Sequence, residues 1–199
     1  MIQEPDISRG LDERHRATAA ELYDESFGDK LGPGVRDREA RLALLAEGFD
    51  GSYAITAVAA GELVGLAGFH DSDGSLTGPI TFGLLRRYLG LVRSIRAVAV
   101  LDLLDHKPAP NELLMDGIAV APTHRGQGTG SKLFAELESE ARQRGFGQIR
   151  LDVIDTNPAA RRLYERLGFE ATKTEKVLFL RPIMGFGAAT TMVKQLTRS

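Results

Sequence analysis

The chain has 199 residues, of which 43% are hydrophobic and 26% are charged, with a formal net charge of -2 and no cysteine. This is ordinary globular composition, and the nearly balanced charge gives no electrostatic footprint for nucleic acid. The absence of cysteine excludes a disulfide scaffold, a thiolate metal site and a cysteine nucleophile.

Neither the N-terminus nor the most apolar stretch has the features of a membrane or secretion signal. Residues 1–16 are charged and lack the apolar core of a signal peptide. Residues 80–105 are interrupted by four arginines, so no run of about 20 apolar residues remains to span a bilayer. We therefore expect a cytoplasmic protein, with neither a membrane nor nucleic acid among its partners.

The N-terminal part is expected to form two helices and a hairpin. Apolar spacing predicts helices over 11–27 and 35–49, and the glycine-rich stretch 28–34 breaks the first one. Two strands follow within 52–70, joined at Ala60-Gly61-Glu62.

The segment 80–105 is predicted to form one helix, because apolar side chains recur in it at helical spacing. These side chains are Leu85, Tyr88, Leu89, Val92 and Ile95. Its arginines allow two interpretations, a solvated polar face or a basic lid near an anionic ligand. The arginines are Arg86, Arg87, Arg93 and Arg96.

The C-terminal half alternates between strands and helices and predicts one mixed α/β layer structure. Asn157 is expected to cap its second helix, and Gly168 to end it. The expected elements are a strand over 111–120, a helix over 130–145, a strand over 146–157, a helix over 158–168, and closing strands over 169–180 and 188–196.

Three glycines lie between the first of these strands and the helix after it, in the stretch Arg125-Gly126-Gln127-Gly128-Thr129-Gly130. The free N–H groups and the dipole of a helix N-terminus favour an anion, and glycines let the backbone approach a phosphate closely. The Walker A order fails here because Gly130-Ser131-Lys132 replaces Gly-Lys-Ser/Thr, and the GxGxxG dinucleotide pattern fails as well.

The pattern Arg125-x-x-Gly128-x-Gly130 follows an apolar strand ending in IAVAP and resembles the acetyl-CoA signature of the GNAT acyltransferases. The later stretch NPAARRLYERLGFE resembles their second signature, with Asn157, Tyr164 and Gly168-Phe169 in place. The resemblance is close over residues 111–180 and looser before them.

The resemblance implies a GNAT fold: a central, mixed but mostly antiparallel twisted sheet, helices on both faces, and a V-shaped splay between two central parallel strands. We expect residues 1–199 to form a single domain of this kind, in which 76–110 resemble a helical insertion.

The resemblance also implies acetyl-CoA as cofactor, with its pyrophosphate on the glycine loop and its pantetheine arm along the preceding strand. Asn157 would contact the arm beyond the splay. The implied cofactor-binding residues are Ile118, Ala119, Val120, Arg125, Gly126, Gln127, Gly128, Thr129, Gly130 and Asn157.

The implied reaction is N-acetylation of a primary amine of a small molecule or peptide, by direct attack in a ternary complex. Tyr164 is the candidate acid for the departing thiolate, and Asp116 the candidate base for the amine. Glu112 at the start of the same strand, or a bound water, could replace Asp116. His124 and His70 are weaker candidates.

Two other functions stay open at this level. One is a non-catalytic acyl-CoA-binding regulatory module on the same fold, because a fold does not fix a function. The other, a nucleotide-binding protein, is disfavoured because both nucleotide fingerprints fail. The four histidines share no ligand spacing, so no metal is expected, and a homodimer is plausible.

Overall fold

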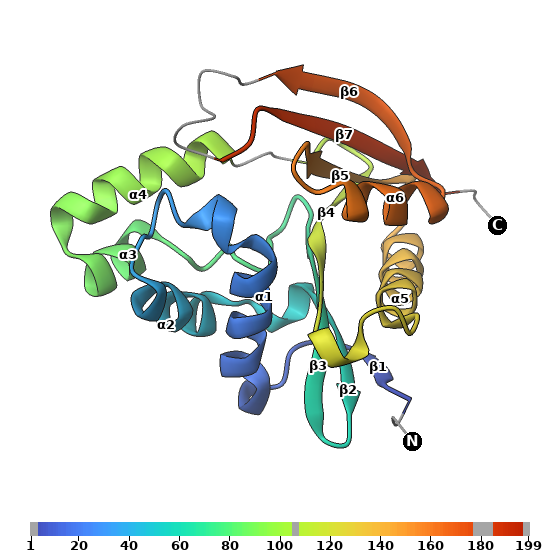
Figure 1. Ribbon diagram of the computed structural model, residues 1–199, viewed down its shortest axis with the longest axis horizontal. Helices are drawn as coiled ribbons and strands as arrows, with labels where there is room; N and C mark the ends of the chain where they lie inside the picture. Colours follow the sequence, from blue (N-terminus) through green and yellow to red (C-terminus); the bar gives the residue numbers. More distant parts are fainter. Residues whose placement is uncertain (1–3, 105–107, 177–184, 197–199) are drawn as a thin grey trace.

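Seven strands form one sheet in the computed structural model, which describes residues 4–104, 108–176 and 185–196 (Figure 1). The strand order is β1-β2-β3-β4-β5-β7-β6, and only β4 and β5 pair in parallel. The predicted mixed, mostly antiparallel sheet is therefore confirmed. The strands are β1 (Asp6–Arg9), β2 (Ala54–Ala59), β3 (Glu62–His70), β4 (Glu112–Val120), β5 (Gln148–Ile154), β6 (Glu170–Lys176) and β7 (Ala188–Gln195).

Helices cover both faces of this sheet, as expected (Figure 1). One face carries α1 (Arg16–Leu31) and α2 (Arg38–Gly48), and the other carries α5 (Thr129–Gln143) and α6 (Pro158–Arg166). Two further helices, α3 (Phe82–Leu89) and α4 (Leu91–Leu104), pack beside α2 at the periphery.

The apolar face predicted for the helix after the glycine loop is confirmed in α5. Leu133, Phe134, Leu137 and Ala141 are all buried and join the core between α5 and the sheet. The helix gives way to Gly145, whose φ of +84° is a conformation that suits glycine. This packing fixes the start of α5 beside the end of β4.

The first helix differs from the prediction, because α1 continues through Gly28 to Leu31. Buried Asp24 forms an ion pair here with buried Arg41 of α2 and another, at 3.1 Å, with the exposed Arg38. A Cβ on Gly28 would lie 2.9 Å from the carboxylate of Asp24. The glycine therefore makes room for the ion pair and does not end the helix.

The prediction of one helix over 80–105 is wrong. Gly90, at φ +74°, ends α3 and separates it from α4, as a left-handed glycine commonly does. The break changes the rotational phase of the second half, so Val92 and Ile95 point to solvent while Ser94 and Ala97 are fully buried.

Two other differences concern the ends of the sheet. The short edge strand β1 was not predicted, since its four residues show little hydrophobic alternation. The closing strands β6 and β7 are present and pair with each other. The rest of the first expected closing strand, and most of the turn after it, fall in 177–184, outside the described residues.

Candidate active site

The two parallel strands at the centre of the sheet separate soon after they begin. Their pairing runs only from Glu112–Leu114 opposite Gln148–Arg150. Beyond these pairs β4 continues to Val120 and β5 to Ile154 without a further bridge between them. The V-shaped splay expected from the resemblance is therefore present, and it leaves the β5 side of the outer half of β4 open.

The glycine loop lies where β4 ends and α5 begins. Gly126 and Gly128 adopt φ values of +74° and +84°, and a Cβ on either would meet no neighbouring atom within 4 Å. The N-cap of α5 is Gly128, and no side chain of the described residues caps this helix end. The N–H groups of 129–131 thus have no intrahelical acceptor, which makes the loop a suitable anion site.

Arg125 and Gln127 hold this loop in place. The guanidinium of Arg125 donates to the carbonyl of Val120 at 2.8 Å and to the carboxylate of Glu25 in α1 at 2.7 Å. The amide of Gln127 donates to the carbonyl of Thr123 at 2.7 Å. A full positive charge therefore lies beside the exposed amides of the loop.

Tyr164 approaches the splay from α6. Its ring is buried and lies 5.8 Å from the ring of Phe169. Burial raises the pKa of Tyr164 to about 12, and a hydrogen bond with the backbone of Ile118 acts in the opposite direction. A contact that lowers a phenol pKa stabilises the phenolate, as a donated amide N–H does. The phenol is protonated at neutral pH and lies against β4.

Asn157 orients the helix that carries this tyrosine. Its side chain accepts a hydrogen bond from the N–H of Ala160 at 3.0 Å, and Pro158 occupies the first turn of α6. The predicted cap is therefore confirmed. Gly168 follows the helix at φ +88°, as expected.

Asp116 is the extra residue of a β-bulge in β4. Gly68 and Phe69 of β3 pair with Gly117 and Met115, so no residue of β3 lies opposite Asp116. Bulges of this kind often redirect a side chain next to a functional site. The Asp116 carboxylate is half-buried on the face covered by α1, where the burial of Tyr23 and, to a smaller extent, the charge of Asp116 raise the pKa of Tyr23.

The residue after the bulge determines how closely α1 can approach. A Cβ on Gly117, whose φ is +149°, would collide with the ring of Phe27. Phe27 also packs on Tyr23, with ring centroids 4.7 Å apart. Two aromatic rings of α1 thus line the region beside Asp116. Nothing in the sequence marked Tyr23, Glu25 or Phe27 as neighbours of the site.

The other candidate bases have different surroundings. The Glu112 carboxylate is buried and accepts hydrogen bonds from Arg150, from Gln148 and from the N–H of Ala109 at 2.8, 2.8 and 3.1 Å. Glu112 therefore forms a structural ion pair with Arg150 at the end of the splay where β4 and β5 still pair. His124 shares a 3.0 Å hydrogen bond with Thr123, and His70 ends β3 opposite Leu114.

Most of the residues singled out in the sequence are brought together along the outer half of β4. Tyr164 contacts Ile118, and Asp116 lies two positions earlier on the same strand. The two candidate catalytic side chains approach β4 from opposite faces of the sheet, one from the α6 side and one from the α1 side. The glycine loop follows Val120 directly.

Two further features of the described part of the chain bear on other kinds of site. No group of three or more His, Cys, Asp or Glu side chains is arranged there to hold a metal ion. None of the helices described is both long and apolar enough to cross a bilayer.

The acetyltransferase (GNAT) family model matches residues 17–169. Over 112 residues the chain is 30% identical to a ribosomal protein bS18-alanine N-acetyltransferase of Haemophilus influenzae, covering 54% of this chain and 75% of that protein. Over 67 residues it is 40% identical to the probable N-acetyltransferase camello of Xenopus tropicalis, covering 34% of this chain.

That second match spans only 31% of the camello protein, and two further relatives are matched over 35% and 33% of their lengths. The chain thus spans about a third of the length of these three proteins. Among solved structures, a GCN5-related N-acetyltransferase from Kribbella flavida superposes with a TM-score of 0.63 at 19% identity, covering 97% of this chain and 98% of that one.

Proposed function

Because this chain belongs to the acetyltransferase (GNAT) family, we propose that it transfers the acetyl group of acetyl-CoA to a primary amine of a small molecule or peptide. The open splay between β4 and β5, with a protonated tyrosine on the α6 face of β4 and a carboxylate on its α1 face, carries this proposal. Residues 1–199 would act as one domain, in which 76–110 form an insertion.

The loop and strand fit the cofactor that the family uses. The open space above Gly126 and Gly128, the uncapped amides of α5 and the charge of Arg125 suit a pyrophosphate. The unpaired side of β4 suits an extended arm bearing amide groups, which would bind as an added strand does. A putative acetyltransferase from Salmonella typhimurium was solved with its cofactor acetyl-CoA.

The proposed cofactor-binding set is the one named from the sequence. The pyrophosphate would lie on the backbone of the loop, and the arm would follow β4 to Asn157. The residues are Ile118, Ala119, Val120, Arg125, Gly126, Gln127, Gly128, Thr129, Gly130 and Asn157. When bound, acetyl-CoA supplies an activated acetyl group as a thioester.

Tyr164 is the proposed donor to the leaving sulfur. Its raised pKa keeps a proton on Oη at neutral pH. A phenol of pKa about 12 is a weaker acid than a thiol of pKa about 8.5, so complete transfer would be uphill by about 5 kcal/mol. The side chain therefore acts first as a hydrogen-bond donor to developing negative charge.

Asp116 is the proposed proton acceptor for the amine. The bulge places its carboxylate on the α1 face of β4, two residues from the strand position that Tyr164 contacts. An amine must lose a proton to become a nucleophile, and a carboxylate within reach can take it directly or through one water. The rest of the rate gain would come from holding the two reactants together.

A coupled binding and turnover experiment tests this function. Calorimetric titration with acetyl-CoA is expected to show binding, and a thiol-release assay against a panel of primary amines is expected to show turnover. Tyr164→Phe should lower kcat by about 10- to 100-fold with little change in KM for acetyl-CoA. Undiminished turnover in this variant would remove Tyr164 from the mechanism, and a lack of acetyl-CoA binding would overturn the function.

A further inference from the structure

The helix pair α3–α4 carries an apolar surface that faces solvent. Among the described residues, every large hydrophobic side chain that is exposed to solvent lies on one of these two helices. They are Phe82, Leu91, Val92, Ile95 and Val98, with exposed fractions of 44, 52, 80, 58 and 39%, and we call them the α3–α4 apolar face. Contiguous exposed apolar surface on a folded protein commonly marks a contact site.

The α3–α4 apolar face is exposed because of the way α4 is oriented. Leu91, Ile95 and Val98 follow one another at helical spacing and form a single stripe, with Val92 beside it. Over residues 91–100 the side chains that are fully buried are the small ones of Ser94 and Ala97, and Leu101 in the next turn packs partly buried against the same cluster. The first three turns of the helix therefore present larger apolar side chains to solvent than to the protein, which is the reverse of an ordinary surface helix.

Positive charge borders the same surface. Arg96 lies next to Val92 on α4, Arg93 lies on the side of α4 away from the stripe, and Arg86 and Arg87 are exposed on α3. The helices α3 and α4 together contain four arginines and a single acidic residue, Asp102. The acidic side chain that approaches is Glu47 of α2, which pairs with Arg87. A partner for this face must therefore offer both negative charge and apolar groups.

From this combination we propose that the α3–α4 apolar face binds the surface of an anionic phospholipid bilayer. Helices that lie on a bilayer bury their apolar side chains at the headgroup boundary while arginines at the edge reach the phosphates. The helix pair lies at the outer end of the molecule, away from the sheet, so a flat surface can reach it (Figure 1). This inference revises the expectation from the sequence that no membrane is a partner.

The same observations disfavour the two other kinds of occupant. A second copy packed symmetrically through the same face would add four more arginines and one more aspartate to the interface, so it would not supply the negative charge. An apolar peptide usually needs a hydrophobic groove. The pocket beside α3 is lined by Glu47, Pro79, Thr81, Gly83, Leu84 and Arg87, and none of the five exposed hydrophobic side chains lines it.

Vesicle flotation with the full chain tests the proposal without any acetylation assay. Binding is expected to vesicles with about 30% phosphatidylglycerol in phosphatidylcholine, to be absent with phosphatidylcholine alone, and to weaken between about 0.05 M and about 0.5 M salt. Equal binding to both compositions, or no binding to either, overturns the proposal.

Variants locate the contact. Ile95→Glu should lower vesicle affinity at least about tenfold, because it places a charge in the apolar stripe. Arg96→Gln should lower it about fivefold. Arg162→Gln, which removes the same charge from an exposed position on α6, is the matched control and should leave affinity unchanged.

Two results would point to another occupant. The exposed position of Ile95 predicts an unchanged melting temperature for Ile95→Glu, so lost binding cannot be attributed to unfolding. Vesicle binding that survives Ile95→Glu overturns the proposal. A dimer seen by light scattering in the parent chain and dissociated by Ile95→Glu would instead assign the face to a second copy.

Discussion

The guanidinium of Arg125 lies 2.7 Å from the carboxylate of Glu25, so an ion pair joins the glycine loop to α1. Both side chains are about half exposed, and such pairs contribute little to stability. Glu25 nevertheless places a negative charge beside the proposed pyrophosphate site. Glu25→Gln should therefore tighten CoA binding by up to about fivefold, with little change in melting temperature.

Calorimetric titration with CoA at low and high salt measures this effect. Glu21→Gln, an exposed acid one turn earlier on α1, is the matched control and should change affinity less. Arg125→Gln should weaken binding. If Glu25→Gln and Glu21→Gln behave alike, Arg125 does not face the bound phosphates.

Two substitutions of the glycine at the N-cap of α5 separate the effect of an added charge on CoA binding from the effect of an added side chain. Gly128 has a φ of +84° and open space around its Cβ position, and Asp and Asn both tolerate this conformation better than other side chains. Gly128→Asp should abolish CoA binding, because it adds a negative charge beside the phosphates. Gly128→Asn should retain much of it. Equal binding by the two variants would mean that the cofactor site is misplaced.

The two carboxylates of β4 should respond differently to neutralisation. Asp116→Asn should lower kcat by about 10²- to 10⁴-fold while the protein stays folded, since a general base contributes about that much. Glu112→Gln should leave turnover by the folded protein unchanged and lower the free energy of unfolding by about 3 kcal/mol, because it breaks a buried pair with Arg150. Unchanged turnover in Asp116→Asn would favour a bound water as the proton acceptor.

The core of the site was predictable because it depends on local sequence. The glycines before α5 and the cap at Asn157 lie within short motifs whose geometry follows from neighbouring residues, whereas the role of Tyr164 is a prediction from the family resemblance. The splay itself was expected only from the family resemblance. No local pattern states where two parallel strands stop pairing, since that depends on what lies between them.

The features that the sequence did not predict mostly depend on contacts between distant segments. The bulge at Asp116 is set by the register of β3 against β4, and the approach of Phe27 by the missing side chain at Gly117. The sequence pattern predicts a helix break at Gly28, although this glycine makes room for a buried ion pair inside α1. The helix end at Gly90 was predictable from the sequence, because a glycine inside an apolar helical pattern can be a C-terminal cap.

Burial of Tyr164 should make the protein sensitive to alkali. An exposed phenol has a pKa of 10, whereas the pKa of folded Tyr164 is about 12. Below pH 10 the phenol is protonated in both states and adds no pH dependence. Between pH 10 and 12 only the unfolded chain ionises, so stability falls as pH rises, by about 3 kcal/mol in all.

Tyr164→Phe removes this contribution, so its unfolding free energy should fall less between pH 9 and pH 12 than that of the parent chain. Urea unfolding at a series of pH values measures the difference. Burial also raises the pKa of Tyr23, so part of the alkaline loss should persist in the variant. Parallel pH profiles for the two proteins would mean that the Tyr164 phenol ionises freely in the folded state.

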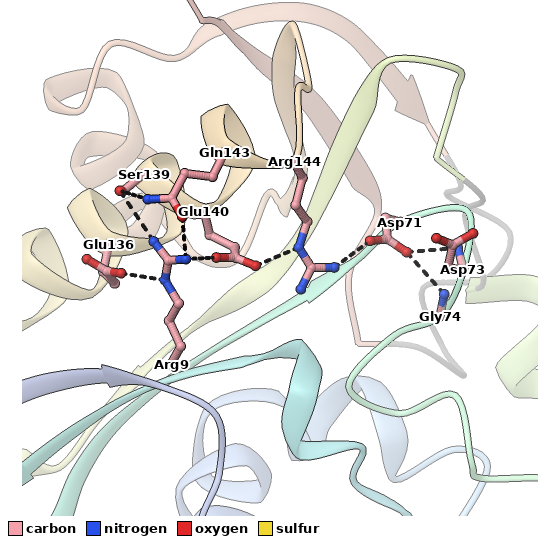
Figure 2. Close-up of polar contacts among 9 residues, drawn as sticks. All are labelled: Arg9, Asp71, Asp73, Gly74, Glu136, Ser139, Glu140, Gln143 and Arg144. Carbon is pink, nitrogen blue, oxygen red and sulfur yellow. Dashed lines mark hydrogen bonds and ion pairs between the residues drawn. The ribbon is translucent and has the colours of Figure 1, made fainter.

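A row of alternating charges connects α5 to the edge of the sheet (Figure 2). Its buried ion pairs can be compared with an exposed ion pair elsewhere in the protein. Glu140 is buried between Arg9 and Arg144 at 2.5 and 2.6 Å, and Arg144 continues to Asp71 at 2.8 Å. Glu140→Gln would leave two guanidinium groups without that charge. We expect it to lower the free energy of unfolding by about 3 kcal/mol, with little dependence on salt.

The comparison is an exposed pair on the same side of the molecule, Arg161 with Glu165 in α6, which are 3.0 Å apart and each about half exposed. Glu165→Gln should cost less than about 1 kcal/mol, and added salt should reduce even that. Urea unfolding of both variants at low and high salt measures the two losses of unfolding free energy and their dependence on salt. Equal, salt-sensitive losses would show that water reaches the row and that α5 is held to β1 by its apolar face alone.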